Sequence, residues 1–262
     1  MTGALDGCTI VVTRPAAQAG HFIGLLDGAG ADCIALPTLV IERVPVEPRL
    51  AEETRETTWD WVLYTSTNAV ECALESLERL PRAKQVAAVG RATARALDRH
   101  GVAVDLRPET ANSEGLLATP EFANVQGCRV LLVKGAGGRT LLRETLAARG
   151  AQVQALEVYR RAPAEPEAAT LARLEAALAS APVRVIVAVT SAEVFDGLSQ
   201  LVPLPLWSTL RNVPLLVPAP RVADAARARG WLGPIVQSAT AEDDTMAATL
   251  QAYVAGAQPA AC

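Results

Sequence analysis

Short apolar runs alternate with longer amphipathic stretches along the whole chain. Cys8–Thr13 is a continuous run rich in β-branched residues, which is typical of a strand buried on both faces of a parallel sheet. Apolar residues then recur at helical spacing through Ala17–Ala29, and Gly30 stands where this helix would end. The same alternation continues toward the C-terminus and predicts an α/β fold, in which helices cover both faces of parallel sheets.

The pattern predicts further elements of both kinds. Strands are expected at Asp32–Leu36, Leu39–Ile41, Trp61–Tyr64, Val86–Val89, Val102–Leu106, Val130–Val133, Gln152–Tyr159, Val183–Thr190, Leu215–Val217 and Pro234–Ser238. Helices are expected at Glu47–Thr58, Asn68–Leu80, Ala92–His100, Ser113–Ala118, Arg139–Arg149, Thr170–Ala179, Ala192–Leu201, Arg221–Arg229 and Thr245–Val254.

The chain also repeats itself. The matched pairs of segments are Ile10–Ile41 with Val130–Arg161, Val62–Ser66 with Val187–Ser191, and Arg91–Gly101 with Pro220–Gly230. A period near half the chain predicts two similar α/β lobes, and a cleft between them is the first place to look for a site.

Composition narrows the classes of function. The 262 residues are 50% hydrophobic and carry a net charge of −4, so the chain lacks the basic footprint of non-specific nucleic-acid binding. No apolar run approaches the roughly 20 residues that span a bilayer, and no signal peptide is recognised. The cysteines and histidines are Cys8, Cys33, Cys72, Cys128, Cys262, His21 and His100, none at metal-ligand spacing. We expect a cytoplasmic protein with reduced thiols and no metal.

Candidate chemistry gathers where predicted strands end, because functional groups of parallel sheets lie beyond their carboxyl ends. Gly135–Gly138 follows a strand but matches no nucleotide-binding pattern, so we interpret it as a tight turn whose N–H groups meet a carboxylate. Ser66 and Ser191 are equivalent in the repeat, and each caps a helix, binds an anion, or does both, since one helix N-terminus can serve both roles. Basic residues at strand ends or first helical turns are Arg14, Arg91, Lys134, Arg139 and Arg221, which favour a basic cleft.

An ordered set of segments carries a family resemblance. The segments are Val11–Pro15 (VVTRP), Gly30–Ile41, Tyr64–Val70 (YTSTNAV), Ala88–Leu97 (AVGRATARAL), Ser113–Leu117 (SEGLL), Arg129–Ala151, Val158–Arg161 (VYRR), Val189–Glu193 (VTSAE) and Val217–Gly230. In this order they resemble uroporphyrinogen-III synthases over nearly the full length of the chain.

The resemblance implies two flavodoxin-like α/β domains with parallel sheets, joined by a two-stranded β-ladder. Domain 1 would comprise residues 1–37 and 163–262, and domain 2 residues 44–156. The linker strands would be residues 38–43 and 157–162. Both linker sequences, TLVIER and EVYRRA, are β-prone, so they can pair.

The implied activity is that of a monomeric, cofactor-independent lyase, which cyclises hydroxymethylbilane to uroporphyrinogen III. Water leaves from ring A, ring D attacks the resulting azafulvene cation through its substituted carbon, and the spiro intermediate recloses with ring D inverted. A transient contact with the upstream enzyme that produces hydroxymethylbilane is a further expectation. The alternative is an inactive two-lobe tetrapyrrole-binding or regulatory module of the same fold; a nucleotide-dependent enzyme is disfavoured by the missing phosphate-loop pattern.

The expected site residues follow from the chemistry at the predicted strand ends and from the family resemblance. The expected substrate-binding residues are Arg14, Ser66, Arg91, Thr93, Lys134, Gly135, Ser191 and Arg221. Tyr159 is the expected catalytic residue, as a general acid for the departure of water, with packing as the alternative role. Thr93 lies in a GRATA segment typical of the family, whereas the equivalent segment of the other lobe has Arg221 and no threonine. The resemblance implies that family members often carry a threonine in this second segment as well. A role for that threonine cannot transfer to this chain.

Overall fold

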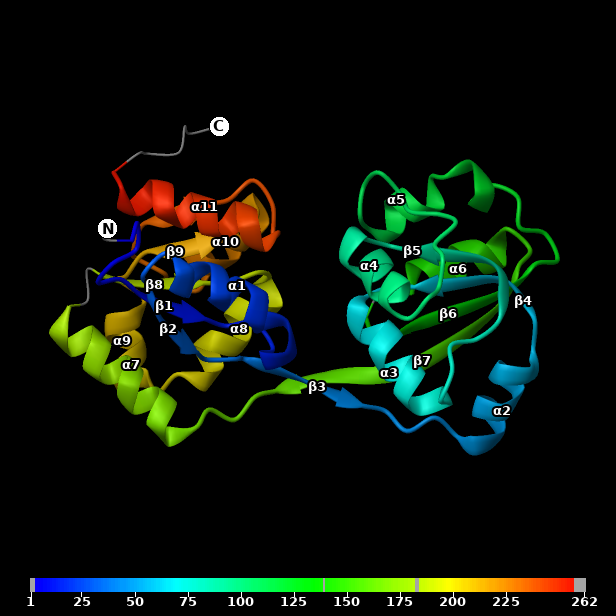
Figure 1. Ribbon diagram of the computed structural model, residues 1–262, viewed down its shortest axis with the longest axis horizontal. Coiled ribbons are helices and arrows are strands. Elements are labelled where there is room, and N and C mark those ends of the chain that lie inside the picture. Colours follow the sequence, from blue (N-terminus) through cyan, green and yellow to red (C-terminus); the bar gives the residue numbers. More distant parts are fainter. Residues whose placement is uncertain (1–2, 139, 182–183, 257–262) are drawn as a thin grey trace. The chain divides into compact units, whose positions relative to one another are not determined.

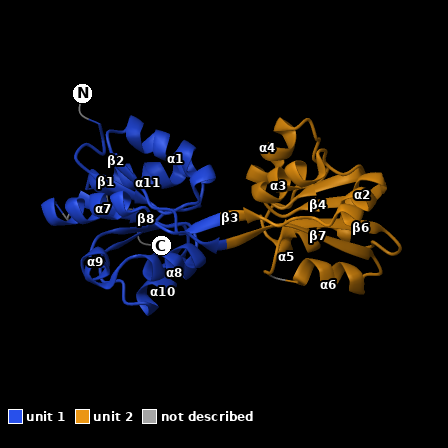
Figure 2. Cartoon of the chain, turned by 90° about the horizontal axis from the view of Figure 1, so that it is seen from below, with its two compact units in different colours: residues 1–40, 162–262 blue, residues 41–161 orange. Residues whose placement is uncertain are grey.

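The computed structural model describes residues 3–138, 140–181 and 184–256, and the chain divides into two compact units (Figure 2). Unit 1 comprises Met1–Val40 and Ala162–Cys262, and unit 2 comprises Ile41–Arg161. Arg139, Val183 and Cys262, which the sequence analysis named, lie outside the described residues. The predicted fold class, two α/β domains built on parallel sheets, is confirmed.

Unit 1 is built on a five-stranded sheet with the spatial order β10-β9-β8-β1-β2, in which every pair of neighbours is parallel (Figure 1). Its strands are β1 (Thr9–Val12), β2 (Asp32–Ala35), β8 (Val185–Ala188), β9 (Leu215–Val217) and β10 (Ile235–Gln237). Its helices are α1 (Ala16–Gly28), α7 (Ala168–Ser180), α8 (Ala192–Leu201), α9 (Leu204–Leu210), α10 (Pro220–Ala228) and α11 (Asp243–Val254).

Both faces of this sheet are covered, because successive strand residues point to opposite sides. Val11 packs with Val187 under α7, α8, α9 and α10, where Phe195 and Trp231 fill the layer. Ile10 and its neighbours pack on the other face under α1 and α11. These two apolar layers explain why the strands read as continuous hydrophobic runs in the sequence.

Unit 2 has a second five-stranded sheet, with the order β3-β7-β6-β4-β5. Its strands are β3 (Leu39–Arg43), β4 (Trp59–Tyr64), β5 (Ala83–Ala88), β6 (Arg129–Gly135) and β7 (Gln152–Pro163). Its helices are α2 (Pro48–Glu56), α3 (Thr67–Leu77), α4 (Arg91–Arg99), α5 (Ser113–Leu117) and α6 (Leu141–Ala148), with a 3₁₀ turn at Pro120–Phe122. One face packs under α2, α3 and α4, and the other under α5, the 3₁₀ turn and α6.

The chain passes between the units within the neighbouring strands β3 and β7. The Val44 N–H donates to the Val158 carbonyl at 3.0 Å, and the Ala164 N–H donates to the Thr38 carbonyl at 3.1 Å. Residue numbers therefore rise along one strand as they fall along the other, so this ladder is antiparallel.

One predicted element is wrong, and one helix of the structure has no predicted counterpart. Val102–Leu106 does not form a strand, since only Leu106 bridges to Ala87. The Asp105 side chain accepts the Val86 N–H at 2.7 Å, so a side chain rather than strand backbone satisfies this N–H. Helix α9 is absent from the predicted elements. Its first turn contains a proline, which is tolerated there because the missing N–H would have no partner within the helix.

Candidate functional site

Each sheet has one point where its strand order reverses, and ligands of such sheets bind beyond the carboxyl ends of the strands at that point. In unit 1 the order reverses between β1 and β8, and in unit 2 between β4 and β6. Arg14, Ser191 and Arg221 lie in unit 1. The remaining predicted site residues, which lie in unit 2, are Ser66, Arg91, Thr93, Lys134, Gly135 and Tyr159.

Ser66 and Tyr159 meet at the reversal point of unit 2. Ser66 is the N-cap of α3, and its Oγ accepts the Ala69 N–H at 3.1 Å. The same Oγ lies 3.0 Å from the Tyr159 hydroxyl, with either group able to donate. The hydroxyl pair thus stands beside a helix N-terminus, where the positive end of the helix dipole favours anionic groups.

Gly135 is the third residue of this arrangement. The parallel pairing of β6 with β7 shifts register after Lys134, so that Glu157 pairs with Lys134 but Tyr159 pairs with Gly135. Tyr159 is consequently buried on the same face as Val158, with only 4% of its surface exposed. Gly135 itself does not have a positive φ.

Lys134 points to the opposite face of the sheet. Its Nζ donates to the Gly137 carbonyl at 2.7 Å and lies 3.6 Å from a Glu157 carboxylate oxygen. It lines a small pocket of about 100 Å³ together with Arg143 and Thr140. The glycine turn therefore presents a carbonyl to Lys134, and the structure does not join Lys134 to the Ser66–Tyr159 pair.

Arg91 and Thr93 lie in the first turn of α4, after β5. Arg91 is exposed, whereas Thr93 is buried against the unit 2 core with 4% of its surface exposed. Strand β5 lies next to β4, on the side away from the reversal point.

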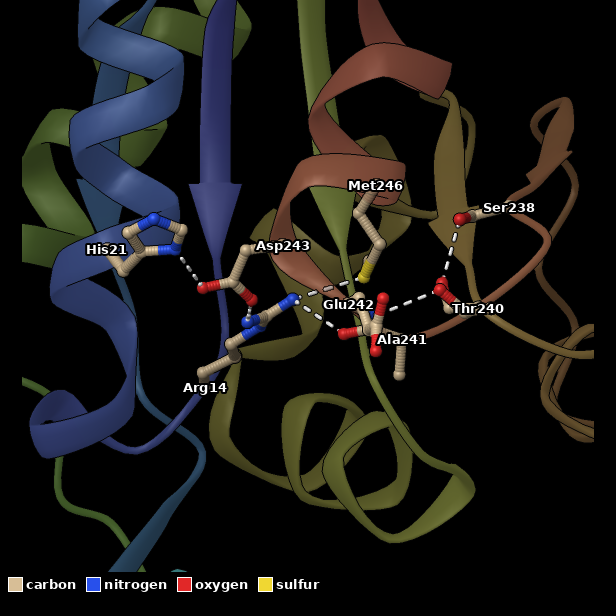
Figure 3. Close-up of polar contacts among 8 residues, drawn as sticks. All are labelled: Arg14, His21, Ser238, Thr240, Ala241, Glu242, Asp243 and Met246. Carbon is tan, nitrogen blue, oxygen red and sulfur yellow. Dashed lines mark hydrogen bonds and ion pairs between the residues drawn. The ribbon is translucent and has the colours of Figure 1, made fainter. Parts of the chain in front are cut away.

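Arg14 follows β1 in unit 1, but its side chain turns inward (Figure 3). The guanidinium forms an ion pair with Asp243 at the start of α11 and lies 4.5 Å from the centre of the Phe22 ring. It also lies 3.1 Å from the Met246 sulfur. Asp243 further binds His21 Nδ1 at 2.9 Å, so both of its carboxylate oxygens are engaged.

Asp243 is a partner that sequence reasoning missed, since the predicted helix began two residues later, at Thr245. The usable signal was the acidic run Glu242–Asp244, because carboxylates favour the first turn of a helix.

The other two unit 1 candidates lie at helix starts. Ser191 is the N-cap of α8, and its Oγ accepts the Val194 N–H at 3.2 Å. Arg221 is an exposed residue in the first turn of α10. Ser191 borders the β1–β8 reversal point, while α10 follows β9, one strand further away.

Three of the described thiols, those of Cys8, Cys33 and Cys72, are poor nucleophiles. Burial raises the pKa of the Cys8 and Cys72 thiols and, together with a hydrogen bond to Asp27, raises that of Cys33 to about 12. The thiolate is the reactive form of cysteine, so these groups stay protonated near neutral pH. Across the described ranges, no cluster of three His, Cys, Asp or Glu residues is placed to hold a metal ion. No helix in that part of the chain is long and apolar enough to cross a membrane.

Curated relatives match the chain along its length. The uroporphyrinogen-III synthase of Escherichia coli is 32% identical over 252 residues, which cover 93% of this chain and 100% of that protein. That of Salmonella typhimurium is 34% identical over 254 residues, with the same shares covered. A putative uroporphyrinogen-III synthase of Methanothermobacter thermautotrophicus is 33% identical over 155 residues, which cover 58% of this chain and 61% of the relative.

Solved structures agree on the fold. Helicobacter pylori uroporphyrinogen-III synthetase has a TM-score of 0.62 at 16% identity, covering 94% of this chain and 99% of that one. A mutant of Thermus thermophilus uroporphyrinogen III synthase has a TM-score of 0.58 at 24% identity, covering 94% and 97%. The family model described as "Uroporphyrinogen-III synthase HemD" matches residues 21–248. The chain therefore belongs to the uroporphyrinogen-III synthase HemD family.

Proposed function

We propose that the chain is a cofactor-independent lyase that converts hydroxymethylbilane into uroporphyrinogen III, with loss of water and inversion of ring D. The observation that carries this proposal is the match, over their whole length, to bacterial proteins named uroporphyrinogen-III synthase. A transient contact with the enzyme that supplies hydroxymethylbilane belongs to the same proposal.

Tyr159 is the proposed general acid for the first step. Breaking the C–O bond of the ring A hydroxymethyl group expels an oxygen that must gain a proton to leave as water. Ser66 Oγ already accepts the Ala69 N–H, so its own proton can be donated to the phenolic oxygen. This arrangement leaves the Tyr159 proton for the substrate.

The bonding electrons depart with the oxygen, and the cation that remains is delocalised as an azafulvene. Ring D attacks it through its substituted carbon, and the spiro intermediate then fragments and recloses. The proton lost when the last pyrrole regains aromaticity balances the proton that Tyr159 donates.

The substrate's carboxylates call for cations and N–H donors. Arg91 and Arg221 are exposed in first helical turns, and Ser66 and Ser191 cap the N-termini of α3 and α8. We assign carboxylate binding to the two guanidinium groups and to the backbone N–H groups at the N-termini of α3 and α8. The side chains of Arg14 and Lys134 are only 9% and 14% exposed, so we assign them weaker contributions.

The test supplies hydroxymethylbilane to purified protein, oxidises the product and resolves the porphyrin isomers. We expect isomer III, formed faster than the spontaneous closure that yields isomer I. Isomer I alone, at the spontaneous rate, would refute the proposal, and tetrapyrrole binding without turnover would select the inactive module.

Tyr159→Phe tests the acid role within this assay. We expect kcat to fall about 10²-fold, the lower end of what a positioned acid or base contributes, with little change in KM. Tyr253→Phe, in the C-terminal helix α11, is the matched control. An unchanged kcat for Tyr159→Phe would leave Tyr159 as a packing residue.

A further inference from the structure

The Tyr159 ring lies across the backbone of Gly135. A Cβ placed on Gly135 would lie 2.7 Å from Tyr159 Cζ, 2.9 Å from Cε2 and 3.1 Å from the hydroxyl oxygen. The first two distances are shorter than non-bonded carbon atoms tolerate, since carbon pairs are most stable at about 3.5–4.0 Å. Because the φ of Gly135 is not positive, the glycine supplies space for the ring rather than an unusual backbone conformation.

The register shift beside Gly135 brings the ring to this place. A regular strand would send Val158 and Tyr159 to opposite faces of the sheet. The shift after Lys134 instead leaves both residues buried in the same apolar cluster. The Ala136 N–H donates to the Tyr159 carbonyl at 2.6 Å, which secures the β7 backbone at this point.

We infer that Gly135 is a positioning residue, which acts on the reaction by holding the Tyr159 hydroxyl against Ser66. Three contacts define the geometry: Ala136 holds the Tyr159 backbone, Gly135 leaves room for the ring, and Ser66 binds the hydroxyl at 3.0 Å. A side chain at position 135 pushes the ring aside and separates the two hydroxyl groups. This role differs from the substrate contact expected for Gly135 from the sequence.

The first experiment reads ring position directly. The chain has three tyrosines, so ring-labelled tyrosine gives three NMR signals, and Tyr159→Phe identifies the signal of Tyr159. We expect Gly135→Ala and Ser66→Ala both to shift this signal while those of Tyr64 and Tyr253 stay in place. Gly90→Ala is the matched control, because Gly90 also follows a strand of the same sheet and its added Cβ meets only Ala111 Cβ, at 3.7 Å. An unmoved Tyr159 signal in Gly135→Ala would overturn the inference.

The kinetic arm rests on the proposed function. Gly135→Ala should lower kcat to within about threefold of Tyr159→Phe, and the double variant should lose no more, because the two changes remove the same interaction. KM should stay within about twofold of the original value, as expected when the lost interaction acts in the transition state. Multiplicative losses in the double variant would refute the positioning role. If the unaltered protein forms no isomer III, the proposed function fails, while the NMR result still decides the role of Gly135.

A stability measurement covers the case in which Gly135→Ala folds poorly. If the added Cβ collides with the ring, Gly135→Ala should lower Tm much less in a Tyr159→Ala background than in the original chain. Equal losses of Tm in both backgrounds would show that the cost of the substitution lies in the backbone, against the inference.

Discussion

Arg14 shows how a single side chain can depart from the role that its place in the sequence indicates. It follows a strand at the edge where ligands bind, yet only 8% of its surface is exposed. Asp243, the Phe22 ring and the Met246 sulfur surround its guanidinium. A charge buried to this degree needs a counter-ion, so the pair ties α11 to the end of β1.

Asp243→Asn should therefore destabilise unit 1. The substitution leaves the Arg14 charge without its carboxylate, and we expect a loss of about 2 kcal/mol in the free energy of unfolding, less than for a fully buried pair. Asp244→Asn is the control, since Asp244 is an exposed acid in the same helical turn. Chemical denaturation measures both variants. Equal losses would mean that helix-dipole effects, rather than the Arg14 pair, account for the change.

Helices α3 and α8 begin in the same way at the scale of elements. Ser66 and Ser191 each have extended backbone and accept the N–H of the residue three positions later. The capping role predicted from the repeat is thus present at both positions. Only Ser66 has a tyrosine beside it, because Leu39 stands in the repeat where Tyr159 stands in the other half.

Ser66→Ala and Ser191→Ala should each lower the free energy of unfolding by about 1 kcal/mol through loss of a helix cap. The expected change is confined to the unfolding of the unit that carries the substitution, which denaturation followed by hydrogen exchange can resolve. Ser180→Ala, at an exposed serine at the end of α7, is the control. If neither cap variant loses more stability than this control, the caps are energetically unimportant.

At the scale of the whole molecule, the two sheets have equivalent strands in the same spatial order. The order of these strands along the chain is circularly permuted between the two units. The repeat aligns β1 and β2 with β6 and β7, β8 with β4, and β9 with β5. The two spatial orders then coincide, as β2-β1-β8-β9 in unit 1 and β7-β6-β4-β5 in unit 2. The same sheet is thus built from two different chain orders, and both reversal points fall between equivalent strands.

Permuted units place Arg91 and Arg221 at equivalent helix starts, after β5 and β9. If both bind substrate carboxylates, replacing either with Ala should raise KM several-fold at low salt and less at high salt, because ions screen exposed charges over about 10 Å at 0.1 M. Arg173→Ala is the control. Arg173 pairs with Asp32 at the beginning of β2, so it lies at the amino ends of the parallel strands, away from the carboxyl ends where ligands bind. Steady-state kinetics at two ionic strengths measure these changes in KM. A KM that stays at the original value in both variants would remove these residues from the site.

The sequence alone determined the fold class, the alternation of elements and the serine caps, because these depend on local periodicity and on hydrogen bonds to neighbouring residues. It placed Tyr159 and Gly135 at strand ends, but it could not pair them, since the shift after Lys134 arises between two strands. Only the tertiary structure decided that Arg14 turns to Asp243, more than two hundred residues away, and that Lys134 faces away from Tyr159. Such choices depend on which face a neighbouring helix covers, and that information is absent from any single stretch of chain.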